Sequence, residues 1–224
     1  MIFEDRYTVV APGSVTRYLD FTREQTVPRM KRAGSQLQLL LTSLIGDSSN
    51  TILQIARYPD FASWQSTQEK IRTGKCAWIE REKVRLLRSV SSRPKSIIPP
   101  EDHRATYTYR TWFINPEDLK TYVRDSEKGV WPLSEALDCR THGLFATLAA
   151  TYPMEIILLA GYHGPGHWGE TRINRHWEQT NPAESRPASI DRKVWEAGCK
   201  SMSNRENTLV RASSVRLWQA QSLK

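Results

Sequence analysis

Cysteines are few in this sequence of 224 residues, and they are widely separated. Cys76, Cys139 and Cys199 are odd in number and form no CxxC pair. Because a disulfide framework and a zinc knuckle both need paired cysteines at short spacing, neither is predicted. We expect buried free thiols, and nothing in the neighbouring sequence indicates a nucleophilic cysteine.

Long hydrophobic runs are also missing. No apolar segment approaches the ~20 residues that a membrane-spanning helix needs. The first residues, 1–6 (MIFEDR), have neither the basic start nor the apolar core of a signal peptide. The sequence therefore predicts a cytoplasmic protein with no membrane span.

The excess of positive charge, +8 in total, is not arranged as in a nucleic-acid-binding protein. Residues 1–104 contain 17 Lys and Arg against 11 Asp and Glu, and the remainder contains 15 against 13. Acidic residues interrupt the basic stretches, as in 80–83 (EREK), whereas a nucleic-acid interface interleaves basic residues with exposed aromatics. We expect a solvated face or attraction for anionic small molecules, and no nucleic-acid partner.

Common catalytic motifs are absent as well. The chain has no Gly-rich phosphate loop, no GxSxG elbow, no HExxH and no paired-carboxylate motif. The sequence therefore predicts no organic cofactor.

What the chain does contain is one internal repeat with an offset of 104 residues. The offset holds without a gap through two strands, a helix and a Pro/Trp pattern. The identical pairs are Arg6/Arg110, Pro12/Pro116, Tyr18/Tyr122, Pro28/Pro132, Leu44/Leu148, Ile52/Ile156, Ala56/Ala160, Tyr58/Tyr162, Trp64/Trp168 and Thr67/Thr171. Because chance would not preserve one register over this length, the pattern indicates a tandem duplication.

Each copy has the pattern of a β-α-β-β-α-β unit, the split βαβ or ferredoxin-like arrangement. Helices are predicted to begin near Ser14 and Asp60, and Pro28 predicts a kink or break near Thr26. The strands are predicted at 7–10, 36–45, 51–58 and 83–90 in the first copy, and at 106–114, 144–150, 155–162 and 208–218 in the second. The fold class is therefore α+β.

The copies define the predicted domains. The first repeat spans 1–92, a linker with three prolines spans 93–104, and the second repeat spans 105–224. The second repeat carries an insertion at about 179–192, which either covers a pocket or is a plain surface loop.

Four segments in their order resemble the NIPSNAP family. They are 7–13 (YTVVAPG), 26–28 (TVP) before a basic turn with Gly34, 43–46 (SLIG) and 50–58 (NTILQIARY). The resemblance covers most of 5–92 and extends through the repeat to about 105–218. The second copy departs from it at 115–117 (NPE) and at 163–167 (HGPGH).

The resemblance implies an architecture, that of the dimeric α/β-barrel superfamily. In such proteins two antiparallel sheets face each other and close a barrel, normally between subunits. A tandem chain can form this pseudo-dimeric barrel internally, and whether a homodimer also forms stays open. The superfamily includes cofactor-free oxygenases, lactone isomerases, polyketide-modifying enzymes, haem proteins and adaptor proteins, and fold cannot choose among these.

Chemistry is predicted in the second copy, which has diverged and holds His142, His163, His167 and His176. Gly166 can serve as N-cap, which puts His167 in the first helical turn, where the helix dipole favours a neutral imidazole able to act as a base. The alternative is that both histidines of the glycine-rich loop are simply exposed. The Gly-Pro-Gly segment prevents His163 and His167 from sharing a helix face, so no metal site is predicted.

The first strand of the second copy adds further candidates. By alternation Tyr107 and Tyr109 share one face, and Arg110 and Trp112 share the other. Tyr109 is a candidate hydrogen-bond donor and Arg110 a candidate partner for a substrate oxyanion, although Arg110 repeats Arg6 and can equally form a structural ion pair. The candidate aromatic or polar lining consists of Trp112, Trp131, Trp177 and His142, and core packing explains such residues as well.

The sequence thus predicts a small-molecule enzyme that acts on an aromatic or polyketide-like metabolite by proton transfer, cyclisation or oxygenation. His163, His167 and Tyr109 are the predicted catalytic residues. The alternatives are a non-catalytic NIPSNAP-like binding or adaptor protein, and a haem protein with His163, His167 or His176 as the axial ligand.

Overall fold

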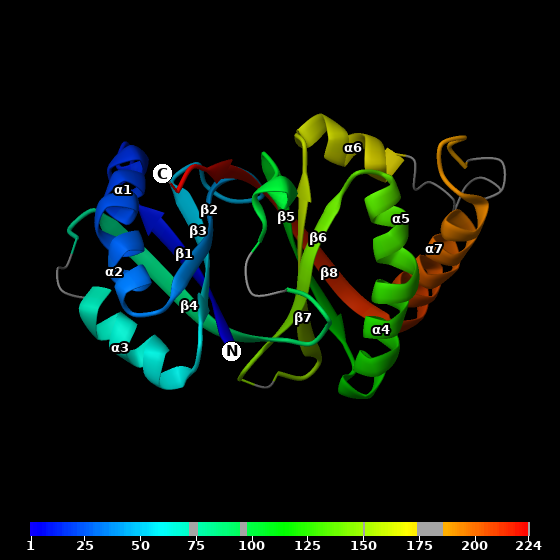
Figure 1. Ribbon diagram of the computed structural model, residues 1–224, viewed down its shortest axis with the longest axis horizontal. Helices are drawn as coiled ribbons and strands as arrows, with labels where there is room; N and C mark the ends of the chain where they lie inside the picture. The colour runs from blue at the N-terminus through cyan, green and yellow to red at the C-terminus, as the bar shows by residue number, and fades with distance from the viewer. Residues whose placement is uncertain (72–75, 95–97, 150, 174–185, 224) are drawn as a thin grey trace. The chain divides into compact units, whose positions relative to one another are not determined.

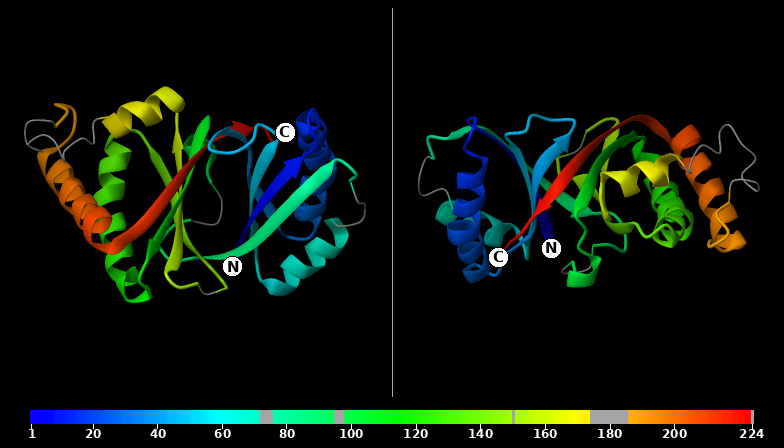
Figure 2. Two further views of the ribbon diagram at one scale, coloured as in Figure 1. Left: turned by 180° about the vertical axis from the view of Figure 1, so that it is seen from behind. Right: turned by 90° about the horizontal axis from the view of Figure 1, so that it is seen from above.

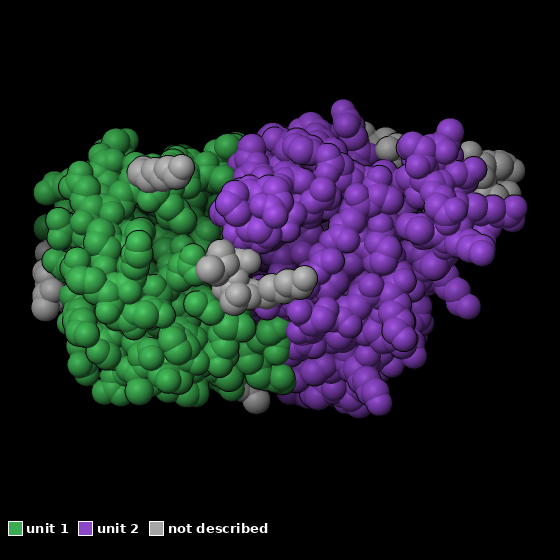
Figure 3. Space-filling view, in the orientation of Figure 1, with its two compact units in different colours: residues 1–89, 147–149, 216–224 green, residues 90–146, 150–215 purple. Residues whose placement is uncertain are grey.

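A computed structural model describes residues 1–71, 76–94, 98–149, 151–173 and 186–223 of the chain. It divides into two compact units, which Figure 3 colours separately. Unit 1 contains Met1–Ser89, Thr147–Ala149 and Arg216–Lys224; unit 2 contains Val90–Ala146 and Ala150–Val215. The predicted linker 93–104 therefore belongs to unit 2, and the end of the last strand belongs to unit 1.

Unit 1 has the β-α-β-β-α-β order predicted for the first repeat (Figure 1). Its elements are β1 (Ile2–Val10), α1 (Val15–Phe21), α2 (Val27–Arg32), β2 (Gln36–Ile45), β3 (Thr51–Tyr58), α3 (Phe61–Ile71) and β4 (Ile79–Ser89). The bounds predicted for β2 and β3 are correct, because each strand is a largely apolar run and the Gly46 turn separates the two. The helices lie on one face of the sheet in the views of Figures 1 and 2.

The sheet of unit 1 is antiparallel. β1 lies between β3 and β4, so that Arg6 is opposite Gln54 on one side and Val84 on the other. β2 pairs with β3 and, on its other edge, with the C-terminal part of β8 (Val210–Gln221), where Thr42 is opposite Gln219. The first unit therefore completes its sheet with the last strand of the chain.

The helix break predicted near Thr26 is present as a π-helical turn. Residues Thr22–Thr26 form this turn between α1 and α2, and Pro28 lies in the first turn of α2. Because proline has no N–H to donate, the helix takes a wider turn just before it. The second repeat has the same feature at Ser126–Val130, before Pro132.

Unit 2 repeats this arrangement and adds a helix. Its elements are β5 (Thr106–Ile114), α4 (Leu119–Asp125), α5 (Trp131–Ala136), β6 (Arg140–Thr147), β7 (Met154–Tyr162), α6 (Pro165–Ile173), α7 (Arg192–Asn204) and the start of β8. β7 lies between β5 and β6 and is antiparallel to both. β8 begins two residues later than predicted because a third π-helical turn, Arg205–Leu209, precedes it.

Helix α7 follows the predicted insertion and packs against the π-helical turn and α5 (Figure 1). Two glycines make this close approach possible. A Cβ on Gly129 would overlap the Ser201 side chain, and a Cβ on Gly198 would lie 2.5 Å from Leu133. The part of the insertion at 179–185 is outside the described residues, while its end caps α7 through Asp191.

The predicted fold class is confirmed. Followed along its hydrogen bonds, the strand order is β1-β3-β2-β8-β5-β7-β6-β4, with β4 paired to β1, which is the order of a tandem α/β barrel of ferredoxin-like repeats. Among the described residues, Cys139 and Cys199 are buried free thiols, as expected, and Cys76 is half-buried. No helix in the described part of the chain has the length and hydropathy needed to cross a membrane.

Candidate functional site

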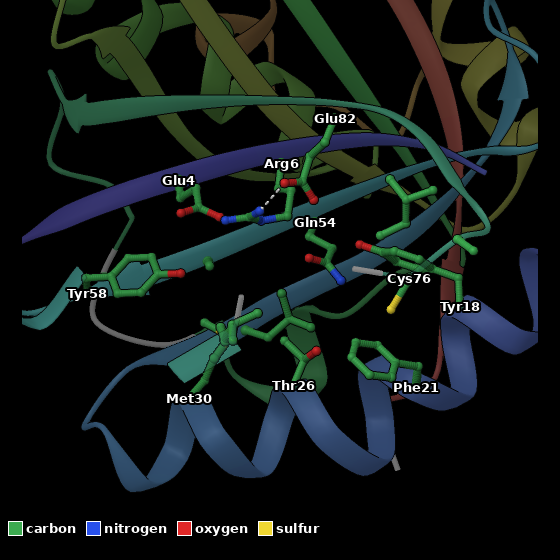
Figure 4. Close-up of a pocket in the computed structure, with 15 residues that line it drawn as sticks. Glu4, Arg6, Tyr18, Phe21, Thr26, Met30, Gln54, Tyr58, Cys76 and Glu82 are labelled. Atoms are coloured by element: carbon green, nitrogen blue, oxygen red, sulfur yellow. Dashed lines mark hydrogen bonds and ion pairs between the residues drawn. The ribbon is translucent and has the colours of Figure 1, made fainter. Parts of the chain in front are cut away.

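Unit 1 contains a cavity of about 690 Å3 between its sheet and the layer formed by α1, the π-helical turn and α2 (Figure 4). Strands β1, β3 and β4 provide its polar wall, and the helices provide a largely apolar wall that includes Phe21 and Met30. Half-buried Cys76 lies at its border. A volume of this size suits a ligand of two or three fused rings.

A buried ion-pair network forms the polar wall of this cavity. The Arg6 guanidinium donates to Glu4 at 2.9 Å, to Glu82 at 2.6 Å and to Gln68 at 2.5 Å. Glu4 is 2% exposed and also accepts hydrogen bonds from Trp64 Nε1 at 2.6 Å and from Gln68 at 3.0 Å. Both Glu4 oxygens are thus occupied, so Glu4 fixes Arg6 in place.

Glu82 differs from Glu4 because one of its oxygens is unused. Its Oε2 accepts from Arg6, while Oε1 has no hydrogen-bond partner among the described residues. The side chain is 30% exposed and its carboxylate points into the cavity (Figure 4). A carboxylate held by one donor, with free lone pairs towards a ligand space, is equipped to accept a proton from a bound molecule.

Neutral hydrogen-bonding groups lie across from this carboxylate. Burial raises the pKa of Tyr18 to about 12, against a smaller opposing effect of its hydrogen bond with Thr8, so the phenol stays protonated at neutral pH. The Gln54 amide projects from β3 towards the helices and donates to the hydroxyl of Thr22 at 3.2 Å. Burial lowers the pKa of Arg6, but Glu4 and Glu82 outweigh burial and raise it, so the guanidinium keeps its charge.

The same position in the second repeat is filled. The 104-residue offset maps Arg6, Gln54 and Tyr58 of the cavity onto Arg110, Leu158 and Tyr162, and these line a space of only about 20 Å3. Trp112 takes the place of Thr8, and Trp131 takes the place of Val27. Both tryptophans are buried, and Arg205 enters the same space from the turn after α7.

The structure divides the predicted site residues among several places. Arg110, Trp112 and Trp131 are brought together around the filled space. Tyr109 is buried on the other face of β5, as the alternation predicted, and so does not join them. Trp177 lies outside the described residues.

His163 and His167 are close to each other, with ring centroids 5.1 Å apart, but they do not line the cavity in unit 1 or the filled space. His167 is in the first turn of α6, as predicted. Its Nδ1 accepts from the backbone N–H of His163 at 3.2 Å, and its Nε2 contacts the carbonyl of Leu137 at 2.8 Å, so both ring nitrogens are engaged. The helix begins at Pro165, so Gly166 lies inside it and is not its N-cap.

Asp138 contacts His163 of this histidine pair, and the sequence did not predict it as a site residue. Its carboxylate lies 2.6 Å from His163 Nε2, and the hydrogen bond with His163 lowers the pKa of Asp138. Asp138 has a φ of 58°, at the position where the first repeat has Gly34 with a φ of 72°. Alignment of the two repeats could have identified Asp138, because an aspartate there replaces a glycine in a turn that requires a left-handed backbone.

His142 is buried, and its Nε2 has no hydrogen-bond partner within the described ranges. It borders a separate space of about 550 Å3 together with Arg93, Arg140 and Asp102. Its ring packs on Tyr107 with centroids 5.4 Å apart. Burial, with smaller effects of His103 and the neighbouring arginines, lowers the pKa of His142 to about 3, so it remains neutral.

The described residues do not fit a metal ion or a haem in the cavity of unit 1 or in the filled space. No group of three or more His, Cys, Asp or Glu residues suited to a metal ion is found in the part of the chain that the structure describes. A space of about 20 Å3 in the second repeat holds about one water molecule and does not admit a porphyrin. The lining of the larger cavity in unit 1 contains no histidine among the described residues. His176, the third predicted axial ligand, lies outside them.

Solved structures show the same fold over the whole chain. A candidate monooxygenase from Lactobacillus acidophilus has a TM-score of 0.60 and 10% sequence identity, with 99% of this chain and 94% of that chain aligned. An anthrone oxidase-like protein has a TM-score of 0.55 and 12% identity, with 99% and 91% aligned. No protein-family model and no curated protein matches the sequence.

NIPSNAP proteins are also among the structural neighbours, as the sequence resemblance predicted. A NIPSNAP family protein from Agrobacterium tumefaciens is 18% identical, with a TM-score of 0.35. The alignment covers 39% of this chain and 91% of that chain, which corresponds to about one repeat. The matches over the whole chain by themselves show the dimeric α/β-barrel fold.

Proposed function

We propose that this protein is a small-molecule enzyme of the dimeric α/β-barrel type that works in its first repeat on an aromatic or polyketide-like metabolite. The supporting observation is the asymmetry of the two copies. A cavity of about 690 Å3 with an unused Glu82 oxygen is open in unit 1, while its counterpart holds about 20 Å3. The proposal therefore moves the site from the second repeat, where the sequence placed it, to the first.

The proposed chemistry begins with proton transfer. Glu82 takes a proton from an acidic C–H of a fused-ring ketone, and the resulting enolate oxygen accepts hydrogen bonds from Tyr18 and Gln54. Arg6 orients the Glu82 carboxylate through their ion pair, and its charge favours the anionic intermediate. No organic cofactor takes part in this scheme.

The enolate has two outcomes that balance. With dioxygen, an anthrone gives an anthraquinone and water, the ring carbon being oxidised and one oxygen atom reduced to water. Without dioxygen, the enolate carbon can attack a carbonyl of the same molecule and close a ring, after which the proton on Glu82 returns to the new alkoxide. Both use the same base and the same oxyanion donors.

Anthrone in air-saturated buffer is the first substrate to test, with anthraquinone formation followed by absorbance. We expect Glu82→Gln to lower kcat by ~10²-fold or more, because the amide cannot accept the proton. Glu80→Gln is the matched control, since Glu80 is exposed on the same strand and does not line the cavity. Binding is followed in parallel by the intrinsic tryptophan fluorescence, to which Trp78 contributes beside the cavity residues Tyr18 and Phe21.

The double variant His163→Ala, His167→Ala distinguishes the two repeats. We expect it to retain turnover. If it abolishes turnover while Glu82→Gln is fully active, the site lies in the second repeat and the proposal is wrong. Fused-ring ligands that quench the tryptophan fluorescence, without any turnover of anthrone, would favour the binding or adaptor protein instead.

A further inference from the structure

Arg205 is a buried cation of unit 2 without an acidic partner among the described residues. Its side chain is 2% exposed, and its guanidinium lies between the rings of Trp112 at 4.5 Å and Tyr122 at 4.9 Å. Within the described part of the chain it makes one hydrogen bond, from Nη1 to the Ser126 hydroxyl at 2.9 Å, and its Nε has no partner. A buried guanidinium normally has its five N–H donors paired and its charge compensated.

The indole N–H of Trp131 is a second buried donor without a described partner, and it belongs to a residue that lines the same filled space as Arg205. The Trp131 side chain is 3% exposed, and its Nε1 has no hydrogen-bond partner among the residues that the structure describes. Trp131 and Arg205 both line the space of about 20 Å3, together with the cationic Arg110. The space thus has two unpaired N–H donors and the buried charge of Arg205 in its lining, which is the reverse of a dry apolar void.

Comparison of the repeats shows that the second copy has no carboxylate at the position where the first copy has Glu4. In the first repeat, Glu4 is buried beside Arg6 and forms an ion pair with it. The residue 104 positions later is Thr108, which lines the filled space and carries no charge. The second copy has therefore lost a built-in carboxylate and gained Arg205.

We propose that the second repeat binds one small monoatomic anion, a chloride or similar halide, in this space. An anion pairs with the N–H donors of Trp131 and Arg205 and also compensates the buried charge, whereas a water molecule does only the former. A volume of about 20 Å3 is close to that of a single water site, so carboxylate and phosphate ligands are too large. The anion then holds α7 and the π-helical turn against the sheet.

The test is thermal unfolding of the full chain with sodium chloride exchanged for sodium gluconate at constant ionic strength. We expect chloride at ten times its Kd to raise Tm by about 3–6 °C. Arg205→Met replaces the cation by an apolar side chain of similar length, and its Tm should not respond to chloride. Arg192→Met is the control at the start of α7, because Arg192 is exposed and forms an ion pair with Glu196; its Tm should respond like the wild type.

If Arg205→Met does not fold, Trp131→Phe provides the second variant, since it removes one N–H donor and keeps an aromatic ring. Chloride binding, measured by 35Cl NMR line broadening, should weaken about tenfold. Crystals grown in bromide should show an anomalous peak between Arg205 and Trp131. A chloride-independent Tm together with no anomalous peak there would mean that water fills the space, and would overturn the proposal. None of these residues lines the cavity of unit 1, so the result is independent of the enzyme proposal.

Discussion

Single substitutions between the copies decide which of two equivalent spaces is open. Thr8 and Val27 of the first copy correspond to Trp112 and Trp131 of the second, and the two tryptophans occupy the volume that is left free in unit 1. The sequence correctly indicated that this face of the second copy became more aromatic. It did not indicate whether the rings line a pocket or fill one, because that depends on how closely the opposite helices approach.

His142 carries a prediction about pH. Its pKa in the folded protein is about 3, below the unfolded value near 6.5, because its ring is buried. The unfolded chain therefore binds a proton that the native protein excludes, and stability falls as the pH falls from about 6.5 towards 3. We expect this residue alone to account for roughly 3–5 kcal/mol over that range.

Urea unfolding of the wild type and of His142→Phe, at pH 7 and at pH 4.5, checks this value. Phenylalanine keeps the ring that packs on Tyr107 and has no proton to gain. The stability difference between the two pH values should be smaller in the variant by about 2–3 kcal/mol. Equal pH dependence in both proteins would show that His142 is not kept neutral by the fold.

The two copies share a π-helical turn, and the second copy adds helix α7, which packs closely on that turn. Pro28 and Pro132 predict a break in the first helix of each copy, and both breaks are π-helical turns. Helix α7 has no counterpart in the described part of the first copy, and it delivers Arg205 to the filled space. Its packing on the second π-helical turn depends on Gly129, because a Cβ there would lie 2.8 Å from the carbonyl of Ala197.

Gly129→Ala should therefore destabilise the protein by about 1–3 kcal/mol, since the added methyl group pushes α7 away from the turn. Gly169→Ala is the control, because Gly169 lies within α6 and a methyl group added there would meet no described atom within 4 Å. That change should be neutral or stabilise by up to about 1 kcal/mol through helix propensity. Urea unfolding measures both, and similar losses in the two variants would contradict this account of the packing.

Across the whole molecule, a sequence repeat and a compact unit are different things. The first repeat ends near residue 92, but unit 1 also contains Arg216–Lys224. Within unit 1, β2 pairs with the end of β8, and Leu217 and Trp218 are each 1% exposed. Trp218 packs edge-to-face on Tyr7 with centroids 5.8 Å apart. The sheet of unit 1 therefore needs the end of β8, which lies outside the first sequence repeat.

A fragment of residues 1–92 tests this arrangement. We expect the fragment to unfold without the cooperative transition of the full chain. Without β8, the edge of β2 is exposed and Tyr7 loses its ring contact with Trp218. Adding a peptide of residues 208–224 should restore part of the circular dichroism signal and amide protection in β2. A fragment as stable as the full chain would show that the last strand contributes little to unit 1.

The sequence by itself determined the duplication, the order of strands and helices apart from α7, the breaks before the prolines and the fold class. These features depend on local periodicity and on a register that spans about half the chain, and both can be read from the sequence alone. The bounds of β2, β3 and β5 were correct for the same reason.

Only the tertiary structure decided which copy holds the open cavity, because an open or filled space is a property of packing between distant segments. Glu82 was not distinguishable in the charged run 80–83, and only the structure shows that it pairs with Arg6 and lines the cavity. Arg205 likewise follows a predicted surface insertion, and its burial depends on contacts with residues almost a hundred positions earlier, such as Trp112. Side-chain volume and unpaired buried charge thus settled what periodicity could not.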